Sequence, residues 1–491
     1  MAGVGFELKR LFQNRTAAGH LRAYSYSVII TAGPFALMTA MVLCVQLLFS
    51  YFHVDLLTSE LFVGAVVYSF VFSQILSSGF TMVITRYVAD SLSIHRYDDI
   101  SASFLGLSSI LSFLGGILGV LFFWNKPLDF GTKLFSYLFF AQLMVVWVES
   151  VYLTALKRYM PLLLTYLSGV LISLFLTYFL LSTSLLLPIH GALLSMDVGM
   201  ALIMISFLIQ IVSHFGLKKG SMHFAFLPYF DRHWRLFLTS IFYTAGLFLP
   251  NIIIWQGPWS IVIGDTFRFS PVYDVVTFYA FLSILPLMAM FVVSTETNFY
   301  EAYARYFDYI IHKGNFREID DARKNVIETL WMGLRHMVEF QLVFSLVFLA
   351  VGNYLLSWSG ITYSQVNMYN VLLMAAFFTG TLQVILILLL YFDYQKDVLQ
   401  VTGFYFLGNL LTGLGGLYLW GEMSYGFTFF AVSLLSLLYG LHRLSHFADR
   451  INYYVFCAQP IFYRPPHGWA TRLAKKLYGE RLIDLEREAG K

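Results

Sequence analysis

Long apolar runs alternate with short polar segments along the whole chain. Each run holds about 20 residues, which as a helix is long enough to cross the ~30 Å hydrocarbon core of a bilayer. The pattern predicts twelve transmembrane helices, near residues 25–50, 60–85, 103–124, 134–156, 161–183, 190–213, 236–256, 273–294, 337–357, 367–392, 400–420 and 425–441. The predicted fold class is therefore an all-α polytopic membrane protein.

The composition and the distribution of charge agree with this pattern. Hydrophobic residues make up 58% of the 491 residues and charged residues only 12%, which is too little charge for a soluble protein of this size. With both termini placed in the cytoplasm, the outer loops carry only Lys126, Lys133 and Arg268 of the 31 basic residues. Basic residues concentrate in cytoplasmic loops. The charges therefore predict cytoplasmic termini and an even number of spans.

Six predicted spans lie on each side of a polar segment near the middle of the chain. An even number of spans gives the two halves the same orientation, so we expect two pseudo-symmetric six-helix bundles with a pathway between them. The predicted parts are a cytoplasmic amphipathic N-terminus (1–24), a first bundle (25–213), a cytoplasmic linker (214–235), a second bundle (236–441) that contains a cytoplasmic amphipathic segment (295–336), and a cytoplasmic tail (442–491).

Two short matches suggest an internal duplication. Residues 31–35 read TAGPF, and residues 244–248, 213 positions later, read TAGLF. The sequence IHR at 94–96 returns as IHK at 311–313, 217 positions later. Proline removes a backbone donor and breaks a helix, and glycine lets a neighbouring backbone approach closely. We therefore predict helix breaks in the first span of each half, at Gly33, Pro34, Gly246 and Pro250.

A pair of charges at comparable depth in the two halves is a candidate gate. Arg86 ends the second predicted span, and Glu296 follows the eighth. An ion pair between them would close a pathway on the cytoplasmic side. The alternative is that both are ordinary charges where helices meet the headgroups, which is the more common situation. Asp274 and Glu339 also lie at span ends, where we expect solvated carboxylates.

Two acidic residues fall well inside predicted spans. Glu149 lies eight residues before Lys157, and Asp197 lies seven residues after His190. A carboxylate that faced lipid would cost about 2.5–3.5 kcal/mol, so each should face the protein interior or water. Proton or cation coupling, substrate contact and a buried structural hydrogen bond are three interpretations that the sequence leaves open.

Aromatic residues make up 18% of the chain. Aromatic faces with nearby hydroxyls suit sugar rings, and Trp147, Tyr152 and Tyr166 in the fourth and fifth spans are candidates to line a pathway. Interfacial belts also use Tyr and Trp. The composition therefore permits sugar binding without showing it.

Motifs for ATP hydrolysis and for metal binding are absent from the sequence. No Gly-rich phosphate loop ends in Gly-Lys-Ser/Thr, and no Cys/His cluster has metal-ligand spacing. We therefore predict that the chain is not an ATPase and that it holds neither metal nor cofactor. We also expect no nucleic-acid partner.

The cytoplasmic segment 295–336 and the tail alternate aromatic or apolar residues with charges at helical spacing. Contact with membrane lipids and docking of a partner protein are equally compatible with this pattern. The candidate docking residues are Tyr303, Tyr306, Arg472, Lys475 and Lys476.

Residues 1–10 read MAGVGFELKR, and a Gly33-Pro34 pair follows in the first span. Residues 298–303 read NFYEAY, and residues 452–460 read NYYVFCAQP. Together these stretches resemble the PelG family, the membrane transporters of Pel exopolysaccharide systems, and the resemblance runs from the first residues into the tail. The family is part of the superfamily of multidrug, oligosaccharidyl-lipid and polysaccharide exporters, whose two six-helix bundles match the predicted organisation.

The resemblance implies export of an N-acetylgalactosamine-rich, partly deacetylated polymer across the bacterial cytoplasmic (inner) membrane. It also implies partners, namely a cytosolic glycosyltransferase, PelF, and the membrane proteins PelD and PelE, of which PelD binds cyclic di-GMP. The chain would then be the conduit of a synthase complex for biofilm matrix and not itself an enzyme. Deacetylated units are cationic, so we hypothesise that Glu149 and Asp197 contact this cargo.

Two other functions remain open at this point. The first is a small-molecule or lipid-linked oligosaccharide antiporter of the multidrug-exporter type. The second is a non-transporting scaffold that anchors the glycosyltransferase. The internal duplication and the acids inside the spans favour a transporter, because a scaffold needs neither.

Overall fold

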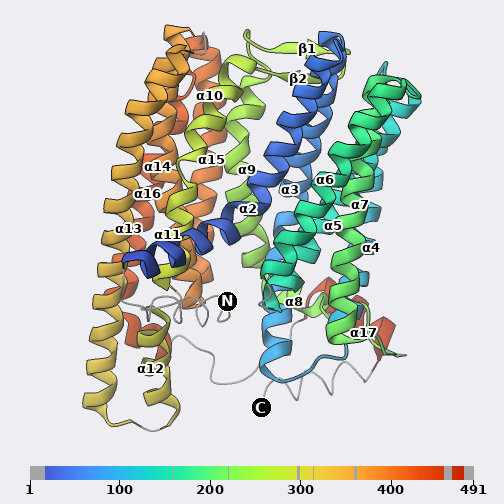
Figure 1. Cartoon of the computed structure of the whole chain (residues 1–491). Helices are drawn as coiled ribbons and strands as arrows, with labels where there is room; N and C mark the ends of the chain where they lie inside the picture. The colour runs from blue at the N-terminus through green and yellow to red at the C-terminus, as the bar shows by residue number, and fades with distance from the viewer. Residues whose placement is uncertain are drawn as a thin grey trace. The chain divides into compact units, whose positions relative to one another are not determined.

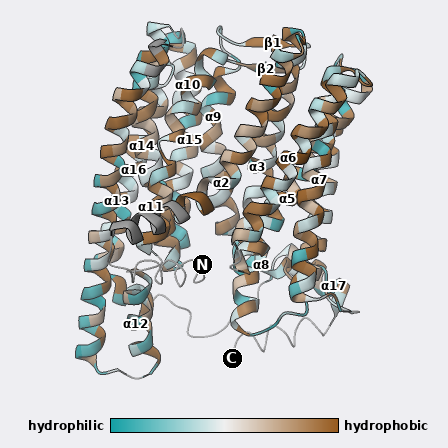
Figure 2. Cartoon of the chain, in the orientation of Figure 1, coloured by the Kyte–Doolittle hydropathy of each residue, from teal (hydrophilic) through white to brown (hydrophobic). Residues whose placement is uncertain are grey.

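The structure is a computed structural model, and it describes residues 17–156, 159–218, 220–295, 299–312, 314–358, 362–457 and 467–479. Within these residues twelve helices are long and apolar enough to cross a membrane, six in each half of the chain. Figure 1 shows these long helices, and Figure 2 shows how hydrophobic residues follow their length. The predicted all-α polytopic fold with twelve transmembrane helices is confirmed. The cytoplasmic location of the termini stays a prediction.

The helices that follow one another in the first half are α2 (Ala17–Tyr51), α3 (Leu56–Ser93), α4 (Ile100–Phe123), α5 (Phe130–Ala155), α6 (Tyr159–Thr183), α7 (Pro188–Phe215) and the short α8 (Leu227–Arg232). The second half contains α9 (Trp234–Ile254), α10 (Pro271–Leu282), α11 (Leu285–Ser294), α12 (Tyr300–Ile311), α13 (Phe316–Trp358), α14 (Tyr363–Tyr391), α15 (Gln395–Leu419), α16 (Phe427–Asp449) and α17 (Trp469–Tyr478). The eighth span is broken between α10 and α11, where Pro286 lies in the first turn of α11 and cannot donate to the preceding turn.

Two compact units divide the chain. Unit 1 comprises Met1–Gly33, Leu249–Ser260 and Ser270–Ile461, and unit 2 comprises Pro34–Phe248, Ile261–Phe269 and Phe462–Lys491. These units differ from the predicted sequential bundles 25–213 and 236–441. The difference arises because the start of α2, the loop after α9 and the tail each pack with helices from the opposite half of the chain.

The division falls inside α2 and α9, at the predicted helix breaks. Gly33 and Pro34 belong to different units, and so do Phe248 and Leu249, which directly precede Pro250. Both helices nevertheless continue through their prolines. A proline leaves a carbonyl without its helical donor and allows the two parts of a helix to differ in direction. This property explains why the chain changes unit at these positions.

A short β-hairpin forms in the loop between α9 and α10, where the sequence analysis expected no strand. Strand β1 (Ile261–Ile263) pairs antiparallel with β2 (Phe267–Phe269). Gly264 and Asp265 in the connecting turn have positive φ angles of 54° and 48°, which glycine and aspartate tolerate better than most residues. Three-residue strands are too short to give a periodic signal in the sequence.

The hairpin is fixed to α3 within unit 2. The ring of Phe267 packs against the ring of Tyr68, with centroids 5.1 Å apart. The Tyr68 hydroxyl donates to the Arg268 carbonyl oxygen (2.7 Å) and accepts from the Arg268 N–H (2.9 Å). Gly64 allows this approach, because a Cβ at that position would lie 3.0 Å from the Phe267 side chain.

The predicted amphipathic segment 295–336 is divided between α12 and the first part of α13, which pack against each other in unit 1. Helix α13 has 43 residues and continues without interruption into the ninth span. Hydrophilic residues gather on α12 and on the adjoining end of α13 (Figure 2). The segment is therefore a helical hairpin rather than a single surface helix.

The predicted linker 214–235 is part of unit 2 and contains α8, against which α17 packs. The Asp231 carboxylate accepts hydrogen bonds from the N–H (2.7 Å) and the hydroxyl (2.6 Å) of Thr471. The small residues Ala470 and Ala474 are buried in this contact. The tail thus returns to the first half of the chain, which the sequence did not predict.

Asp129 caps the N-terminus of α5 and joins it to α7. Its carboxylate accepts from the N–H (3.0 Å) and the hydroxyl (2.6 Å) of Thr132 and pairs with His190 Nε2 at 2.6 Å. Burial would raise the pKa of Asp129, but the hydrogen bonds from Thr132 and His190 outweigh this effect and lower the pKa to about 2. Aspartate is a favoured residue at this helix position.

We expect Asp129→Ala to lower the unfolding temperature at pH 7 and to lower it less as the pH falls. A carboxyl group whose pKa is lower in the folded state stabilises that state at pH values above its ordinary pKa of 3.8. This contribution is lost as the pH falls through the pKa of about 2 that the group has in the folded state. Thermal unfolding in detergent from pH 7 to pH 3 measures the difference. Asp308→Ala, at an exposed carboxylate of α12, is the control. A difference that stays constant down to pH 3 would contradict the assignment.

Candidate functional site

Two acidic side chains are buried inside unit 2. Glu149 on α5 has no exposed surface and Asp197 on α7 is 4% exposed. Neither carboxylate has a hydrogen-bond partner among the described residues. The interpretation of a buried structural hydrogen bond therefore finds no support. A carboxylate that is charged in such an interior costs several kcal/mol unless a proton, a cation or another partner compensates it.

The two acids lie at different depths. Helices α5 and α7 pack against each other and begin at the same end of unit 2, where Asp129 joins them to each other. Asp197 lies nine residues after Pro188, whereas Glu149 lies nineteen residues after Phe130. Ten residues of helix correspond to about 15 Å. The acids are therefore two separate sites along one helix pair rather than a carboxylate dyad.

The three aromatic residues predicted to line a pathway are packed inside unit 2. The Trp147 Nε1–H donates to Ser73 Oγ at 3.1 Å. The hydroxyl of the fully buried Tyr152 hydrogen-bonds Ser103 Oγ at 2.8 Å. Tyr166 is 5% exposed and packs edge-on against Phe207. Their role in lining a pathway stays a prediction.

Arg86, one half of the predicted gate, is paired on its own helix. Arg86 Nε pairs with Asp90 Oδ1 on the same helix at 3.2 Å, and both side chains are partly exposed. Glu296 lies outside the described residues. In the described part of the chain Arg86 thus forms an ion pair with Asp90, and its pairing with Glu296 in a gate stays a prediction.

The expectation for Asp274 is wrong, because this carboxylate is not simply solvated. It accepts hydrogen bonds from Asn251 Nδ2 (2.7 Å), Trp255 Nε1 (2.9 Å) and the Ser270 N–H (3.0 Å). These contacts tie the end of α9, directly after Pro250, to the start of α10 within unit 1. Asn251 lies in the last turn of α9, and Trp255 follows the helix directly, four residues later. This helical spacing is the signal of the site in the sequence.

We expect Asp274→Ala to reduce the free energy of unfolding by about 3 kcal/mol, because three donors lose one shared acceptor. Asp274→Asn should recover part of the loss, since an amide oxygen still accepts. The unfolding temperature of the purified protein is the measurement. Glu339→Ala is the matched control, because Glu339 is exposed and pairs only with Arg335 of the same helix as far as the structure describes it. Equal losses in the two alanine variants would contradict the role of Asp274.

The candidate docking residues differ in their accessibility. Tyr306 is fully buried, its hydroxyl donates to Asn452 Oδ1 (3.0 Å), and burial raises its pKa to about 12. Tyr303 is half-buried and packs against Phe307. Arg472 and Lys476 of α17 are exposed and Lys475 is partly exposed. The α17 cations are thus the candidates that remain open to a partner or to lipid headgroups.

The described residues contain no group of three or more His, Cys, Asp or Glu side chains placed to hold a metal ion. The buried acids Glu149 and Asp197 are the ionisable candidates that unit 2 offers for this site. A buried carboxylate can take up a proton or bind a cation.

Comparison with solved structures identifies the class of fold. A variant of the Vibrio cholerae MATE transporter VcmN matches with a TM-score of 0.63 at 10% sequence identity, over 93% of this chain and 100% of that chain. A MOP superfamily transporter from Pyrococcus furiosus matches with a TM-score of 0.53 at 13% identity, over 86% and 96% of the two chains. An outward-facing multidrug resistance MATE family transporter gives 0.54 at 14% identity, also over 86% and 96%. At these identities the likeness shows the fold, which is that of the MOP superfamily transporters.

The sequence places the chain more narrowly. The family model described as PelG, a putative exopolysaccharide exporter, matches residues 1–456. The chain belongs to the PelG family, as the resemblance in the sequence predicted. No curated protein matches the chain in sequence. Family and fold are those of a membrane exporter, and not of an enzyme.

Proposed function

We propose that this protein exports Pel-type exopolysaccharide, an N-acetylgalactosamine-rich and partly deacetylated polymer, across the bacterial cytoplasmic membrane. The observation that carries the proposal is the match of the PelG family model to residues 1–456. The twelve spans and the MOP transporter fold support a transport role without naming a substrate. The polymer, the bacterial inner membrane and the biofilm matrix are parts of the proposal.

The proposal includes a place for the protein in a complex. The polymer would be built by the cytosolic glycosyltransferase PelF and handed to this chain, with PelD and PelE as membrane partners. The exposed Arg472 and Lys476 on α17 support a docking surface for such a partner, because their side chains are accessible. Helix α17 is held to α8 by the Asp231–Thr471 hydrogen bonds, so a partner would meet a helix that is anchored to unit 2.

A second function is favoured by the buried acids. Glu149 and Asp197 each lack a partner among the described residues, as expected for a site that exchanges a proton or a cation during transport. An antiporter for small molecules or lipid-linked oligosaccharides would use such a site. Gradient-driven polymer export would use it too, whereas export driven by polymerisation would not. For both functions, Glu149 and Asp197 are therefore the residues that would couple transport to an ion gradient.

Deletion of the chain in its source bacterium tests the proposed export. We expect extracellular N-acetylgalactosamine polymer to disappear while the glycosyltransferase remains present and active in the cytosolic fraction. Complementation with the wild-type chain should restore the polymer. Unchanged extracellular polymer in the deletion strain would overturn the proposal. Loss of glycosyltransferase activity together with the polymer would instead favour the scaffold function.

A further inference from the structure

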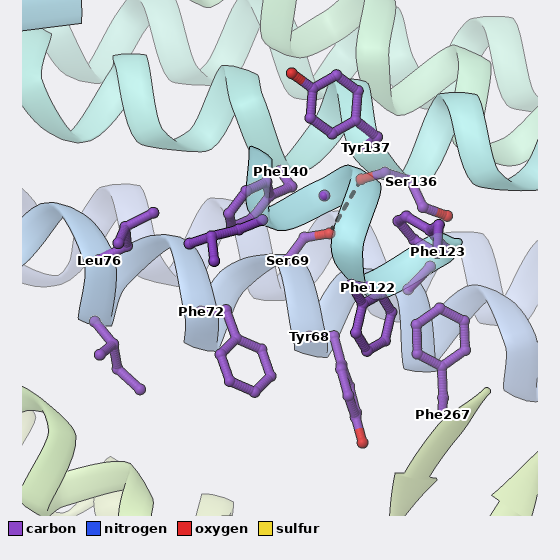
Figure 3. Close-up of a pocket in the computed structure, with 14 residues that line it drawn as sticks. Tyr68, Ser69, Phe72, Leu76, Phe122, Phe123, Ser136, Tyr137, Phe140 and Phe267 are labelled. Atoms are coloured by element: carbon purple, nitrogen blue, oxygen red, sulfur yellow. Dashed lines mark hydrogen bonds between the residues drawn. The ribbon is translucent and has the colours of Figure 1, made fainter. Parts of the chain in front are cut away.

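Apolar side chains in the spans of unit 2 lie in two kinds of surroundings. Some face the interior, as around the pocket of about 280 Å³ between α3, α4, α5 and β2, which Phe122 and Phe267 help to line (Figure 3). Others are exposed on the outer faces of the spans, where the bilayer covers them, such as Leu164 and Leu171 of α6. The exposed apolar side chains of α17 need a different account, because a helix of ten residues is too short to cross a membrane.

Helix α17 exposes an apolar stripe along its length. Trp469, Leu473 and Leu477 are 73%, 44% and 52% exposed. They recur at every fourth position and therefore share one face of the helix. We call these three side chains the α17 stripe. Apolar surface is stabilised when it is removed from water, so the stripe favours a contact that covers it.

Two exposed cations border the α17 stripe. Arg472 lies three residues after Trp469, and Lys476 lies three residues after Leu473. Residues at this spacing are neighbours on the surface of a helix. Both cationic side chains are exposed, and Lys475 beside them is partly exposed. A helix with Lys and Arg on one face and Trp and Leu on another is typical of helices that lie in a membrane interface.

The contacts of α17 place it where spans of unit 2 end. The N–H and the hydroxyl of Thr471 donate to the carboxylate of Asp231, three residues before α9 begins. Near the other end of the helix, the Tyr478 hydroxyl accepts from the Phe224 N–H (3.0 Å), nine residues after α7 ends. Both anchors belong to the short segment that joins the sixth and seventh spans. Figure 1 shows α17 at this end of unit 2.

The start of α9 carries residues that are typical of a membrane interface. Trp234, its first residue, is 48% exposed, and the Arg235 guanidinium lies 5.5 Å from the centre of its ring. Tryptophan is enriched where spans meet the headgroups, and basic residues flank the ends of spans. The segment that anchors α17 thus leads directly into this interface, and lipid is the apolar phase within reach of the α17 stripe.

We propose that α17 lies in the membrane interface, with the α17 stripe against the acyl chains and with Arg472 and Lys476 at anionic phospholipid headgroups. Long basic side chains reach the headgroups while their apolar neighbours insert. The bilayer meets unit 2 at this level, so the contact needs no further component. A protein partner on the same two cations would have to cover the stripe as well. The lipid contact does not depend on the exported cargo.

Photocrosslinking in the full-length protein tests the apolar half of the contact. The photoreactive amino acid p-benzoylphenylalanine replaces Leu473 or Leu477, and the protein is placed in nanodiscs with equal amounts of phosphatidylglycerol and phosphatidylcholine. We expect phospholipid adducts at both positions, which mass spectrometry identifies. The same substitution at Leu171, exposed in the middle of α6, is the lipid-facing control. Arg305, exposed on α12, is the control outside the spans and should give no phospholipid adduct.

The anionic headgroup is tested by the ratio of the two lipids in the adducts. We expect more phosphatidylglycerol than phosphatidylcholine at Leu473 and equal amounts at Leu171. Arg472→Gln combined with Lys476→Gln should lower the ratio at Leu473 by about fivefold or more, since each basic residue near an anionic surface contributes about fivefold to binding. The matched control, which should leave the ratio unchanged, neutralises two exposed cations of unit 1 with Arg317→Gln and Lys396→Gln.

Three outcomes would overturn the proposal. Phospholipid adducts at Leu171 but none at the α17 stripe would show that the stripe does not contact the bilayer. Equal amounts of the two lipids at Leu473 would remove the anionic headgroup. Adducts with added purified glycosyltransferase in place of lipid would assign the stripe to a protein partner. Monodisperse elution and helical circular dichroism establish that each variant is folded, and crosslinking is measured without export, so this proposal and the proposed export can fail independently.

Discussion

Replacing Glu149 by glutamine is expected to abolish export that depends on an ion gradient while leaving the protein folded. Glu149 is fully buried on α5 and has no hydrogen-bond partner among the described residues. A neutral amide of the same shape meets the same packing, but it cannot take up and release a proton or bind a cation. We expect roughly a tenfold or greater loss of gradient-driven transport, since ionisable groups inside spans are functional by default.

The measurement is uptake of labelled polymer into sealed inverted membrane vesicles with an imposed proton gradient. Glu339→Gln provides the matched control, because Glu339 is exposed and pairs with Arg335 on the surface of α13. Asp197→Asn should resemble Glu149→Gln if both acids act in coupling. Full gradient-driven transport by Glu149→Gln would leave Glu149 as a buried residue without a role in coupling.

Replacing Gly199 by alanine is expected to destabilise unit 2 strongly, although it adds a single methyl group. A Cβ at Gly199 would lie 2.6 Å from the carbonyl oxygen of Gly169, and a Cβ at Gly169 would lie 2.8 Å from that of Gly199. The backbones of α6 and α7 therefore touch at this point, as small residues allow in membrane helices. A backbone atom cannot move away by a change of rotamer, as a side chain can. We therefore expect the unfolding free energy to fall by about 2–3 kcal/mol.

Gly191→Ala on the same helix is the control for this prediction. A Cβ at Gly191 would find Leu180 atoms at 3.4 and 3.9 Å, which is ordinary van der Waals contact. Alanine is intrinsically preferred over glycine inside a helix by about 1 kcal/mol, so this variant should be as stable as the wild type or more stable. Unfolding temperatures in detergent compare the two. Similar temperatures for Gly199→Ala and Gly191→Ala would show that α6 and α7 move apart at little cost.

The sequence was sufficient to predict the transmembrane spans, because the bilayer allows a chain few alternatives to a helix. A backbone inside lipid must satisfy its own hydrogen bonds, so each long apolar run becomes a helix. The breaks predicted at Pro34 and Pro250 stay predictions, because α2 and α9 both continue through their prolines. The change of unit inside these two helices was not readable from the sequence, since it depends on packing partners far away in the chain.

The candidate sites show the same limit. That Glu149 and Asp197 lie inside spans follows from sequence position. That neither has a hydrogen-bond partner in the described part of the chain depends on which side chains the neighbouring helices bring near them. The side-chain partners of Asp274 are 19 and 23 residues earlier, before a hairpin with no periodic signal. The apolar pocket needs three helices and a strand to exist at all. Local patterns predict elements, whereas sites arise from the surfaces that those elements bring together.

The central claim is that this chain moves polymer across the membrane, and protection of newly made polymer tests it most directly. Sealed inverted vesicles with or without the chain are supplied with the purified glycosyltransferase and labelled UDP-N-acetylgalactosamine, and a glycoside hydrolase is then added outside. We predict that polymer becomes protected only when the chain is present. Protection that an uncoupler removes would assign the driving force to an ion gradient, and protection that survives would assign it to polymerisation. Intact synthesis without protection in any condition would contradict the claim.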